Sequence, residues 1–442
     1  MSQVTSQVVP DGYKQTEVGI IPNDWASLTL DDVCCFVGGA QPEKSTFSYK
    51  QQPGYIRLIQ IRDYKSDKNT VYIPEKLARK KCDENDIMIG RYGPPIFQIL
   101  RGIEGAYNVA LIKAIPASCI NREFLYYILK DEQLFELMDT LSQRSSGQTG
   151  VDLPALKAYP IGLPSEKEQT AIATALSDVD ALFDELEKLI AKKQAIKTAT
   201  MQQLLTGKTR LPQFSIYADG DKQGQIKGTK PSELGEIPED WDVARMGDVS
   251  NVNQGLQIEI EQRKSYQSEI SKPYITIQSL KLTEPTEFID EYSSAVCCVE
   301  DEILMTRTGN TGIVVTGVTG VFHNNFFKIV YQKSKLNKDF FVCFLRSSDS
   351  KKRILDKAGT STIPDLNHND FYSLPIILPS KKEQTAIATI LTDMDKEIQA
   401  LQQRLSKTRQ IKQGMMQELL TGKTRLPFDK VDTKSQGEPD AN

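Results

Sequence analysis

Histidine is scarce in this sequence, and so are long apolar runs. Only His323 and His368 occur in 442 residues, which excludes a histidine-rich metal site and disfavours a histidine-dependent catalytic triad. No stretch approaches the roughly 18 apolar residues of a membrane span, and the amino terminus lacks the basic start and apolar core of a signal peptide. We therefore expect a soluble, cytoplasmic protein without membrane contact.

Cofactor-binding and nucleophilic motifs are also missing. The seven cysteines include two adjacent pairs but no Cys-x-x-Cys, so reduced and mostly buried thiols are expected. Gly-Lys-Thr occurs twice, but a phosphate-binding loop needs a glycine where Gln202 and Gln417 stand. No Gly-rich dinucleotide loop, metal cluster or Asn/Asp-Pro-Pro-Tyr/Phe element of an amino-methylating enzyme is present. The sequence predicts a non-catalytic chain that holds no cofactor or metal of its own.

What the sequence does contain is a duplication. Of the 50 residues at 163–212, 29 are identical at 378–427, an offset of 215. The Ile-Pro-x-Asp-Trp that opens each copy keeps both tryptophans, Trp25 and Trp241, in register. The predicted divisions are a variable module at 1–163, a near-constant segment at 164–212, a variable module at 213–378, a near-constant segment at 379–427 and a polar tail at 428–442.

The near-constant segments have the pattern of long helices. Apolar residues recur at alternating spacings of four and three, which is the seam of a coiled coil. The seam residues are Ile172, Leu176, Val179, Phe183, Leu186 and Ile190 in the first copy and Ile387, Leu391, Met394, Ile398, Leu401 and Leu405 in the second. About 40 helical residues at 1.5 Å each make a rod of roughly 60 Å. Gly207 and Gly422 are expected to end the rods in a left-handed cap.

Charge changes sign along each predicted rod. Acidic residues dominate the first half and basic residues the second half, which suits the helix dipole. A parallel pair would set acid beside acid, whereas an antiparallel pair sets acid beside base, so antiparallel pairing is expected. Two modules joined by antiparallel rods would have an approximate two-fold axis across the rods, with one module at each end.

The variable modules are expected to be mixed units of short strands, turns and a helix. Predicted strands lie at 54–64, 71–76, 86–93 and 108–116 with a helix at 122–141, and again at 273–282, 302–317 and 326–332 with a helix at 339–348. The predicted fold class is therefore α+β. It comprises two mixed α/β modules joined by two long antiparallel coiled-coil helices, as a pseudo-two-fold tandem repeat.

Polar residues at the ends of these strands are candidate DNA contacts. Arg suits guanine, Asn and Gln suit adenine, and Lys suits phosphate, although an ordinary solvated side chain is the alternative at each position. The candidates are Gln41, Lys44, Arg62, Lys65, Arg91, Tyr92, Arg101 and Asn108 in the first module and Gln257, Gln278, Lys281, Arg307, Asn310, Thr311, His323, Asn324 and Asn325 in the second. Arg91 and Arg307 are the best supported, because both precede a Gly-bearing turn at the same repeat position.

The duplicated motifs resemble those of specificity subunits of type I restriction–modification systems. The resemblance covers about residues 15–427 and rests on Ile-Pro-x-Asp-Trp, on Leu-Pro-Ser-x-Lys-Glu-Gln-Thr-Ala-Ile-Ala and on Leu-Leu-Thr-Gly-Lys-Thr-Arg-Leu-Pro, each present twice. It implies that 1–163 and 213–378 are target recognition domains, each contacting one half of a split, asymmetric site in double-stranded DNA. It implies that 164–212 and 379–427 are spacer helices that fix the gap of unread base pairs.

The resemblance also implies partners. Two methyltransferase (modification) subunits would carry S-adenosylmethionine, and restriction/translocase subunits would use ATP and Mg²⁺. Two other functions stay open: a stand-alone DNA-binding regulator or coiled-coil interaction protein, and a self-sufficient modification or restriction enzyme, which the missing cofactor and Pro-Pro motifs disfavour. The 54 basic and 58 acidic residues give a net charge of −4, and the two variable modules sum to −1 and −5. We therefore expect the chain alone to bind DNA weakly and its partners to supply much of the phosphate contact.

Overall fold

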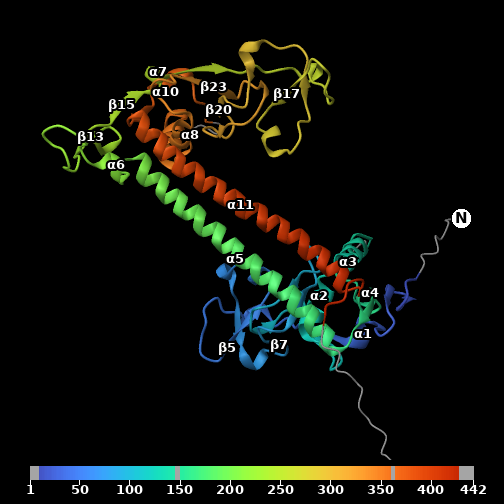
Figure 1. The fold of residues 1–442 in the computed structure, drawn as a ribbon. Helices are drawn as coiled ribbons and strands as arrows, with labels where there is room; N and C mark the ends of the chain where they lie inside the picture. Colours follow the sequence, from blue (N-terminus) through green and yellow to red (C-terminus); the bar gives the residue numbers. More distant parts are fainter. Residues whose placement is uncertain (1–8, 145–149, 360–363, 428–442) are drawn as a thin grey trace, which may run out of the picture. The chain divides into compact units, whose positions relative to one another are not determined.

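A computed structural model describes residues 9–144, 150–359 and 364–427, so the predicted polar tail lies outside the described residues. The chain divides into two compact units, unit 1 formed by 1–186 with 404–442 and unit 2 formed by 187–403. Each unit contains a sheet-bearing module, the first part of one long helix and the last part of the other (Figure 1). The fold is α+β with tandem modules, as the sequence predicts.

Module 1, in unit 1, is built from short strands. They are β1 (Tyr13–Thr16), β2 (Gly19–Pro22), β3 (Ala26–Thr29), β4 (Cys34–Gly38), β5 (Tyr55–Ile59), β6 (Tyr72–Pro74), β7 (Lys81–Cys82), β8 (Ile87–Gly90), β9 (Ile99–Leu100), β10 (Gly105–Tyr107), β11 (Leu111–Pro116) and β12 (Pro160–Leu163). The helices are α1 (Leu30–Val33), α2 (Arg122–Leu129), α3 (Glu132–Arg144) and α4 (Leu153–Lys157), with 3-10 turns η1 (Lys44–Thr46), η2 (Ile61–Tyr64), η3 (Asp67–Asn69) and η4 (Glu75–Leu77).

Module 2, in unit 2, has the same kind of elements. The strands are β13 (Thr229–Ser232), β14 (Gly235–Pro238), β15 (Asp242–Arg245), β16 (Ser250–Gln254), β17 (Lys272–Ile275), β18 (Phe288–Ile289), β19 (Cys297–Cys298), β20 (Ile303–Thr306), β21 (Val314–Val315), β22 (Gly320–Phe322), β23 (Phe326–Tyr331) and β24 (Pro375–Leu378). The helices are α6 (Pro212–Ser215), which precedes the module, α7 (Met246–Val249), α8 (Lys338–Arg346), α9 (Ser348–Ala358) and α10 (His368–Ser373), with turns η5 (Ile260–Gln262), η6 (Ser279–Lys281) and η7 (Ser294–Val296).

The two modules share one sheet topology. The strand orders are β4-β11-β8-β9 and β6-β5-β10-β7 in module 1, and β16-β23-β20-β21 and β18-β17-β22-β19 in module 2. One pair in each module, β5 with β10 or β17 with β22, is parallel. The order is the same strand for strand, so the duplication extends through modules whose sequences have diverged.

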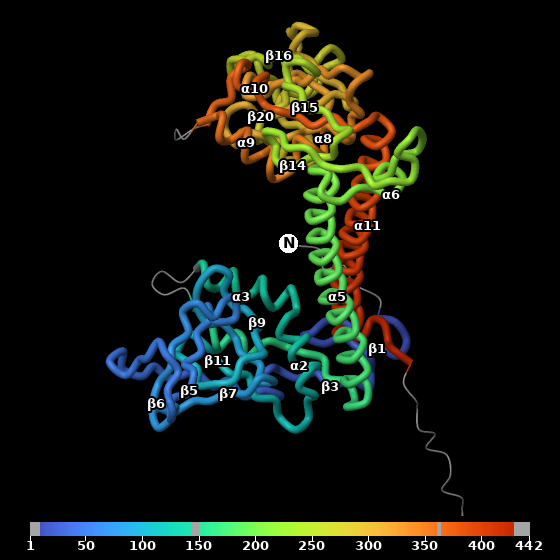
Figure 2. The backbone as a smooth tube through the Cα atoms, turned by 90° about the vertical axis from the view of Figure 1, so that its left-hand side faces the viewer, coloured from blue at the N-terminus to red at the C-terminus, as the bar shows by residue number. Residues whose placement is uncertain are grey.

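We call β4-β11-β8-β9 and β16-β23-β20-β21 the first sheets, and β6-β5-β10-β7 and β18-β17-β22-β19 the second sheets. In module 1, α2, β11 of the first sheet and β5 of the second sheet follow one another away from α5 (Figure 2). Successive residues of a strand face opposite sides of its sheet, so one strand can serve two cores. In module 2, Ile303 of β20 packs with Phe340 of α8, while the next residue, Leu304, packs with Phe322 of the second sheet. Module 1 repeats this arrangement, since Ile87 faces the helices and Met88 faces the second sheet.

One predicted helix is divided in the structure. Residues 122–141, expected as a single helix, form α2 and α3 with a break at Asp131. The Asp131 carboxylate accepts hydrogen bonds from the backbone N–H groups of Gln133 at 3.0 Å and Leu134 at 3.1 Å. A side chain that caps a new helix start competes with continuation of the preceding helix, and apolar periodicity does not register that competition.

The near-constant segments form two long helices, α5 (Glu166–Leu205) and α11 (Lys381–Leu419). A serine caps each start: the N–H of Glu168 donates to Ser165 Oγ at 3.4 Å, and the N–H of Glu383 donates to Ser380 Oγ at 3.3 Å. The glycine beyond each end is left-handed, with φ of 72° at Gly207 and 70° at Gly422. The predicted caps are therefore confirmed.

Within each unit the two helix segments run antiparallel. In unit 1, Lys412 of α11 pairs with Asp180 of α5. In unit 2, Lys197 of α5 pairs with Asp395 of α11, at the same repeat positions. The predicted seam residues are all buried or half-buried. Basic second halves lie beside acidic first halves, so the antiparallel pairing expected from the charge gradient is confirmed.

A buried carboxylate links three segments in unit 1. Glu168, at the start of α5, is 1% exposed. The indole N–H of Trp25 donates to its Oε2 at 3.2 Å, and the guanidinium of Arg425 donates to both carboxylate oxygens at 2.8 and 2.6 Å. These three residues come from the module entry, the start of one long helix and the segment after the other.

Unit 2 repeats this arrangement. Glu383 is 2% exposed and accepts hydrogen bonds from Trp241 Nε1 at 3.0 Å and from Arg210 at 2.9 and 2.7 Å. Arg210 also binds Asp240, as Arg425 binds Asp24 in unit 1. We call the sets Trp25–Glu168–Arg425 and Trp241–Glu383–Arg210 the carboxylate joints. The three motifs that carry the internal repeat meet at them.

The adjacent glutamine of the same motif is fully hydrogen-bonded. Gln169 Nε2 donates to the carbonyl oxygens of Pro164 at 2.9 Å and Cys119 at 3.2 Å, and its Oε1 accepts from the N–H of Asn121 at 2.7 Å. Gln384 makes the equivalent three bonds in unit 2. Each amide ties the start of a long helix to the segment that enters α2 or α8.

Two glycines near the end of α11 should respond oppositely to alanine. At Gly422 a Cβ would lie 2.5 Å from Pro22 and 3.1 Å from the Trp25 ring, at positive φ, whereas at Gly414 nothing lies within 4 Å. We predict that Gly422→Ala lowers the free energy of unfolding by about 2 kcal/mol or more. Gly414→Ala should raise it by about 0.5–1 kcal/mol. Urea unfolding of the full chain measures both, and changes of the same sign would contradict this account of the joint.

Candidate DNA interface

Loops from four strands meet at one end of each module. In module 1, Tyr107 of β10 lies beside Ile59 of the parallel strand β5, so both strands end together. Strands β4 and β8 end beside the start of β11, where Gly38 pairs with Ile112 and Gly90 with Leu111. We call the loops after β4, β5, β8 and β10 the loop edge of module 1. The loops after β16, β17, β20 and β22 form the loop edge of module 2.

Seven of the eight module 1 candidates lie on this edge. They are Gln41 and Lys44 after β4, Arg62 and Lys65 after β5, Arg91 and Tyr92 after β8, and Asn108 after β10. All are exposed except Tyr92, which is half-buried, and Asn108, which is 9% exposed. The Asn108 side chain accepts a hydrogen bond from the N–H of Ala110 at 3.1 Å, so it holds the β10–β11 turn. The Arg91 guanidinium lies 5.2 Å from the Tyr92 ring, and no carboxylate within the described ranges pairs with it.

The remaining module 1 candidate, Arg101, lies at the other end of the sheet. Because Leu100 pairs with Met88, the residue after it lies beside the start of β8 rather than its end. Arg101 donates to the Glu123 carboxylate at 2.6 Å and stacks 3.9 Å from the Tyr126 ring centroid. Its guanidinium therefore contacts two residues of α2 and lies apart from the other candidates.

All nine module 2 candidates lie on the second loop edge. They are Gln257 after β16, Gln278 and Lys281 after β17, Arg307, Asn310 and Thr311 after β20, and His323, Asn324 and Asn325 after β22. Two of these loops are joined directly, because Asn324 Nδ2 donates to Gln257 Oε1 at 3.3 Å. A third joins through the backbone, where the N–H of Arg307 donates to the carbonyl oxygen of Asn325 at 2.7 Å.

Unlike Arg91, Arg307 already forms an ion pair within its module. Its side chain is 16% exposed, donates to Asp365 at 2.8 Å and lies 5.5 Å from the Phe327 ring. Thr311 is 4% exposed and donates to the carbonyl oxygens of Arg307 at 3.0 Å and Pro364 at 2.6 Å. In module 2 these two residues shape the loop, whereas Asn310, Gln257, Gln278 and Lys281 are exposed.

His323 presents a neutral imidazole at this edge. Burial, with a smaller contribution from the nearby Arg263 cation, lowers the pKa of His323 below its usual value. Its Nδ1 accepts a hydrogen bond from the N–H of Asn325 at 3.1 Å. The proton of the neutral ring therefore sits on Nε2, which makes that nitrogen a donor.

Two glycines that were not predicted as site residues allow the loops to converge. A Cβ on Gly39 would lie 1.9 Å from the carbonyl oxygen of Asn108, and one on Gly255 would lie 2.2 Å from that of Phe322. Only glycine lets the chain leaving the first sheet pass so close to the β10–β11 or β22–β23 turn. Their signal in the sequence is the corresponding Gly-containing pair of turns, at 38–44 and 253–259.

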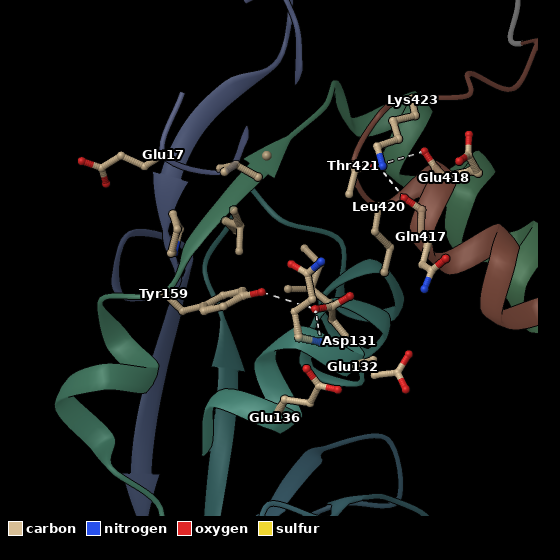
Figure 3. A pocket seen from close by; sticks show the side chains of 16 residues that line it. Glu17, Asp131, Glu132, Glu136, Tyr159, Gln417, Glu418, Leu420, Thr421 and Lys423 are labelled. Atoms are coloured by element: carbon tan, nitrogen blue, oxygen red, sulfur yellow. Dashed lines mark hydrogen bonds between the residues drawn. The ribbon is translucent and has the colours of Figure 1, made fainter. Parts of the chain in front are cut away.

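An acidic cavity of about 590 Å³ in unit 1 is a poor match for DNA. Five carboxylates line it, from Glu17, Asp131, Glu132, Glu136 and Glu418, and the Tyr159 hydroxyl donates to Asp131 at 3.3 Å (Figure 3). Such a wall repels phosphate. The loop edge, which carries exposed Arg and Lys, is the better candidate.

The described residues offer little for catalysis. Among them, no group of three or more His, Cys, Asp or Glu is placed to hold a metal ion. Burial raises the pKa of the Cys82, Cys298 and Cys343 thiols to about 11, so these sulfurs stay protonated near neutral pH. No described helix is both long and apolar enough to cross a membrane.

Comparison with known proteins points to one family. The model of the type I restriction modification DNA specificity domain matches the chain twice, at residues 22–198 and 238–409. The type I restriction enzyme MjaVIII specificity subunit of Methanocaldococcus jannaschii is 23% identical over 435 residues, which is 94% of this chain and 96% of that protein. The EcoDI specificity subunit of Escherichia coli is 23% identical over 187 residues, covering 42% and 38%.

Solved structures share the fold. The type I restriction-modification S subunit from M. genitalium superposes with a TM-score of 0.55 at 17% identity, covering 90% of this chain and 96% of that chain. A chain from a study of complex assembly and conformational transition of the type I R-M system has a TM-score of 0.54 at 14% identity, covering 91% and 99%. At these identities the likeness concerns the fold alone.

Arg91 and Arg101 provide a matched test of the loop edge. We predict that Arg91→Ala weakens binding to a duplex that carries the recognised site by about tenfold, because it removes an exposed guanidinium without disturbing an ion pair. Arg101→Ala should leave DNA affinity within about twofold, since its guanidinium already binds Glu123. Fluorescence-anisotropy titrations at fixed salt measure both. A larger loss for Arg101→Ala than for Arg91→Ala would contradict the assignment of the interface.

Proposed function

The chain belongs to the family of type I restriction–modification DNA specificity subunits, which are non-catalytic, and on this basis we propose separate roles for its two modules and its long helices. Each module contacts one half of a bipartite, asymmetric site in double-stranded DNA through its loop edge. The long helices set the number of unread base pairs between the halves and dock two methyltransferase subunits. The observation that carries the proposal is a pair of loop edges with the same strand frame and different side chains.

Differences at matched positions support reading of two different half-sites. At one repeat position Arg91 is exposed, while Arg307 is bound to Asp365. At another, the residue that holds the turn after the strand is Asn108 in module 1 and His323 in module 2, so an amide in one module is replaced by an imidazole in the other. Because base readout depends on which donors and acceptors reach the groove, such modules would favour different bases.

The continuity of the helices supports the spacing role. Helix α5 begins in unit 1 and continues into unit 2, and α11 begins in unit 2 and continues into unit 1. Neither has an internal proline, and a continuous helix has a fixed rise per residue. A change in helix length would therefore change the gap between half-sites by a calculable amount.

Repeated exposed residues support docking of two copies of one partner. Ile196 of α5 and Ile411 of α11 occupy the same repeat position and are 43% and 49% exposed. Lys192 and Lys407 precede them by one helical turn, also at one repeat position. An apolar side chain beside a lysine, presented once by each unit, suits a partner that binds twice. The S-adenosylmethionine, ATP and Mg²⁺ of the reaction would be carried by modification and restriction/translocase subunits, in the cytoplasm where the DNA is.

Mapping of methylated bases tests this function. In cells that contain this chain and its modification partner, we predict methylation at a motif with two different specified halves and an unspecified gap. Sequencing that detects modified bases across the genome measures it. Deletion of the gene for this chain should abolish methylation at the motif. A continuous palindromic motif would contradict the proposal.

Lengthening both helices tests the spacer. We predict that one heptad inserted after Leu186 and another after Gln403 lengthens the gap by about three base pairs while the specified bases stay the same. Seven residues preserve the seam and add about 10.5 Å, and base pairs are about 3.4 Å apart. Methylation mapping is again the measurement. The control is the same heptad added after Pro427, which should leave the gap unchanged. New specified bases at the original gap would contradict the spacer role.

A further inference from the structure

The loops after β4 and β16 each present a tyrosine to solvent. Tyr49 in module 1 is 76% exposed, and Tyr266 in module 2 is 63% exposed. In the described part of the chain, no hydrogen-bond partner is found for either hydroxyl. Large aromatic side chains are usually buried or bonded, because their exposed apolar surface is unfavourable in water. Two such residues in equivalent loops call for a shared explanation.

The path of these loops brings both tyrosines toward the loop edge. Ser48 pairs antiparallel with Tyr72 of β6, which is itself antiparallel to β5, so the chain at Ser48 runs in the direction of β5. That direction leads to the loop edge, and Tyr49 is the next residue. In module 2, Lys264 pairs in the same way with Phe288 of β18, and Tyr266 follows two residues later.

Both loops are anchored to the second sheet. Phe47, two residues before Tyr49, and Ile258, eight residues before Tyr266, pack on the outer face of that sheet in their respective modules. In module 1, backbone hydrogen bonds of 2.9 and 2.8 Å join Ser48 to Tyr72. In module 2, Asp290 accepts from Lys264 on one side of Tyr266 and from Ser268 Oγ at 2.9 Å on the other. An anchored loop loses little further entropy when its exposed side chain meets a ligand.

These observations indicate what the tyrosines contact. An aromatic ring can stack on any nucleobase, and apolar side chains can insert between base steps, so neither interaction requires a particular sequence. The loops differ in their polar residues, and each carries one exposed tyrosine, one residue after the bridge at Ser48 and two residues after the bridge at Lys264. An aromatic ring whose exact position varies by a residue suits a contact that positions DNA rather than one that identifies it. Lys50, which follows Tyr49, is exposed, whereas the Lys264 ammonium, 5.8 Å from the Tyr266 ring, is paired with Asp290. The two rings therefore share their aromatic surface rather than a cation that is available for phosphate.

We propose that Tyr49 and Tyr266 stack on nucleobases at the margins of the two half-sites and hold each half-site against its loop edge. The proposal rests on the proposed function, since it requires that the loop edges bind DNA. It assigns the tyrosines a positioning role that is independent of the bases read by the polar side chains. Each tyrosine acts on the half-site of its own module.

The test uses the full chain assembled with its modification partner and a duplex carrying the mapped methylation site. Tyr49→Ala and Tyr266→Ala should each weaken binding at least about fivefold, and the Phe variants should stay within about twofold because they keep the ring. Ile226→Ala is the control, because Ile226 is 81% exposed but lies before β13, away from the loop edge. Tyr49→Ala should change the fluorescence of 2-aminopurine only in the half-site of module 1, and Tyr266→Ala only in that of module 2.

The possible results distinguish a failure of this inference from a failure of the proposed function. If both Ala variants bind the duplex as tightly as the wild type, the inference is wrong. It is also wrong if, at either position, the Phe variant loses as much DNA affinity as the Ala variant. Affinity changes for the Ala variants that are confined to particular base sequences would overturn the positioning role. If instead the wild-type complex does not distinguish the mapped site from a shuffled duplex, the proposed function fails before the tyrosines are tested.

Discussion

The buried carboxylate at the start of each long helix is the interaction on which the architecture depends. A carboxylate that is 1–2% exposed is costly unless it is paired and hydrogen-bonded, and Glu168 and Glu383 each have an arginine and an indole N–H as partners. The arginine follows the helix that began in the other repeat. Neither module can therefore satisfy its own carboxylate with its own repeat, and the two repeats are interlocked through these charges.

This interlock explains which parts of the chain vary. The joints, the glutamine beside each carboxylate and the glycine packed on each tryptophan occupy one region of a unit, and all belong to repeated motifs. The loop edges contribute nothing to the joints. Substitutions at the loop edge change exposed or locally bonded side chains without exposing a buried charge. This separation allows the residues of the loop edge, and therefore the ligand that they select, to change while the buried joints stay intact.

The sequence predicts the frame better than the site, and particular residues show why. The helices, their caps and their antiparallel pairing follow from local periodicity, from glycines and from charge order, all of which act between near neighbours in sequence. The positions of the candidates at strand ends are also local. The partners of the candidate side chains, by contrast, are distant in sequence: Arg101 binds Glu123, 22 residues away, and Arg307 binds Asp365, 58 residues away. The close approach at Gly39 likewise depends on a turn some 70 residues downstream.

The charge of the loop edges bears on how the modules share the DNA. Exposed cations on the module 1 edge include Lys44, Arg62, Lys65 and Arg91, whereas Lys281 is the one exposed cation among the module 2 candidates. The other module 2 candidates are amides, a hydroxyl and a neutral imidazole, which can supply hydrogen bonds but would attract phosphate weakly. Long-range attraction comes from net charge, and module 2 is also the more acidic module. Under the proposed function, its half-site would therefore be held largely by contacts that form only after module 1 or a partner has brought the DNA close. Within unit 2 the buried joint Trp241–Glu383–Arg210 is formed by other residues than these candidates, so their contacts with DNA would not have to break its hydrogen bonds.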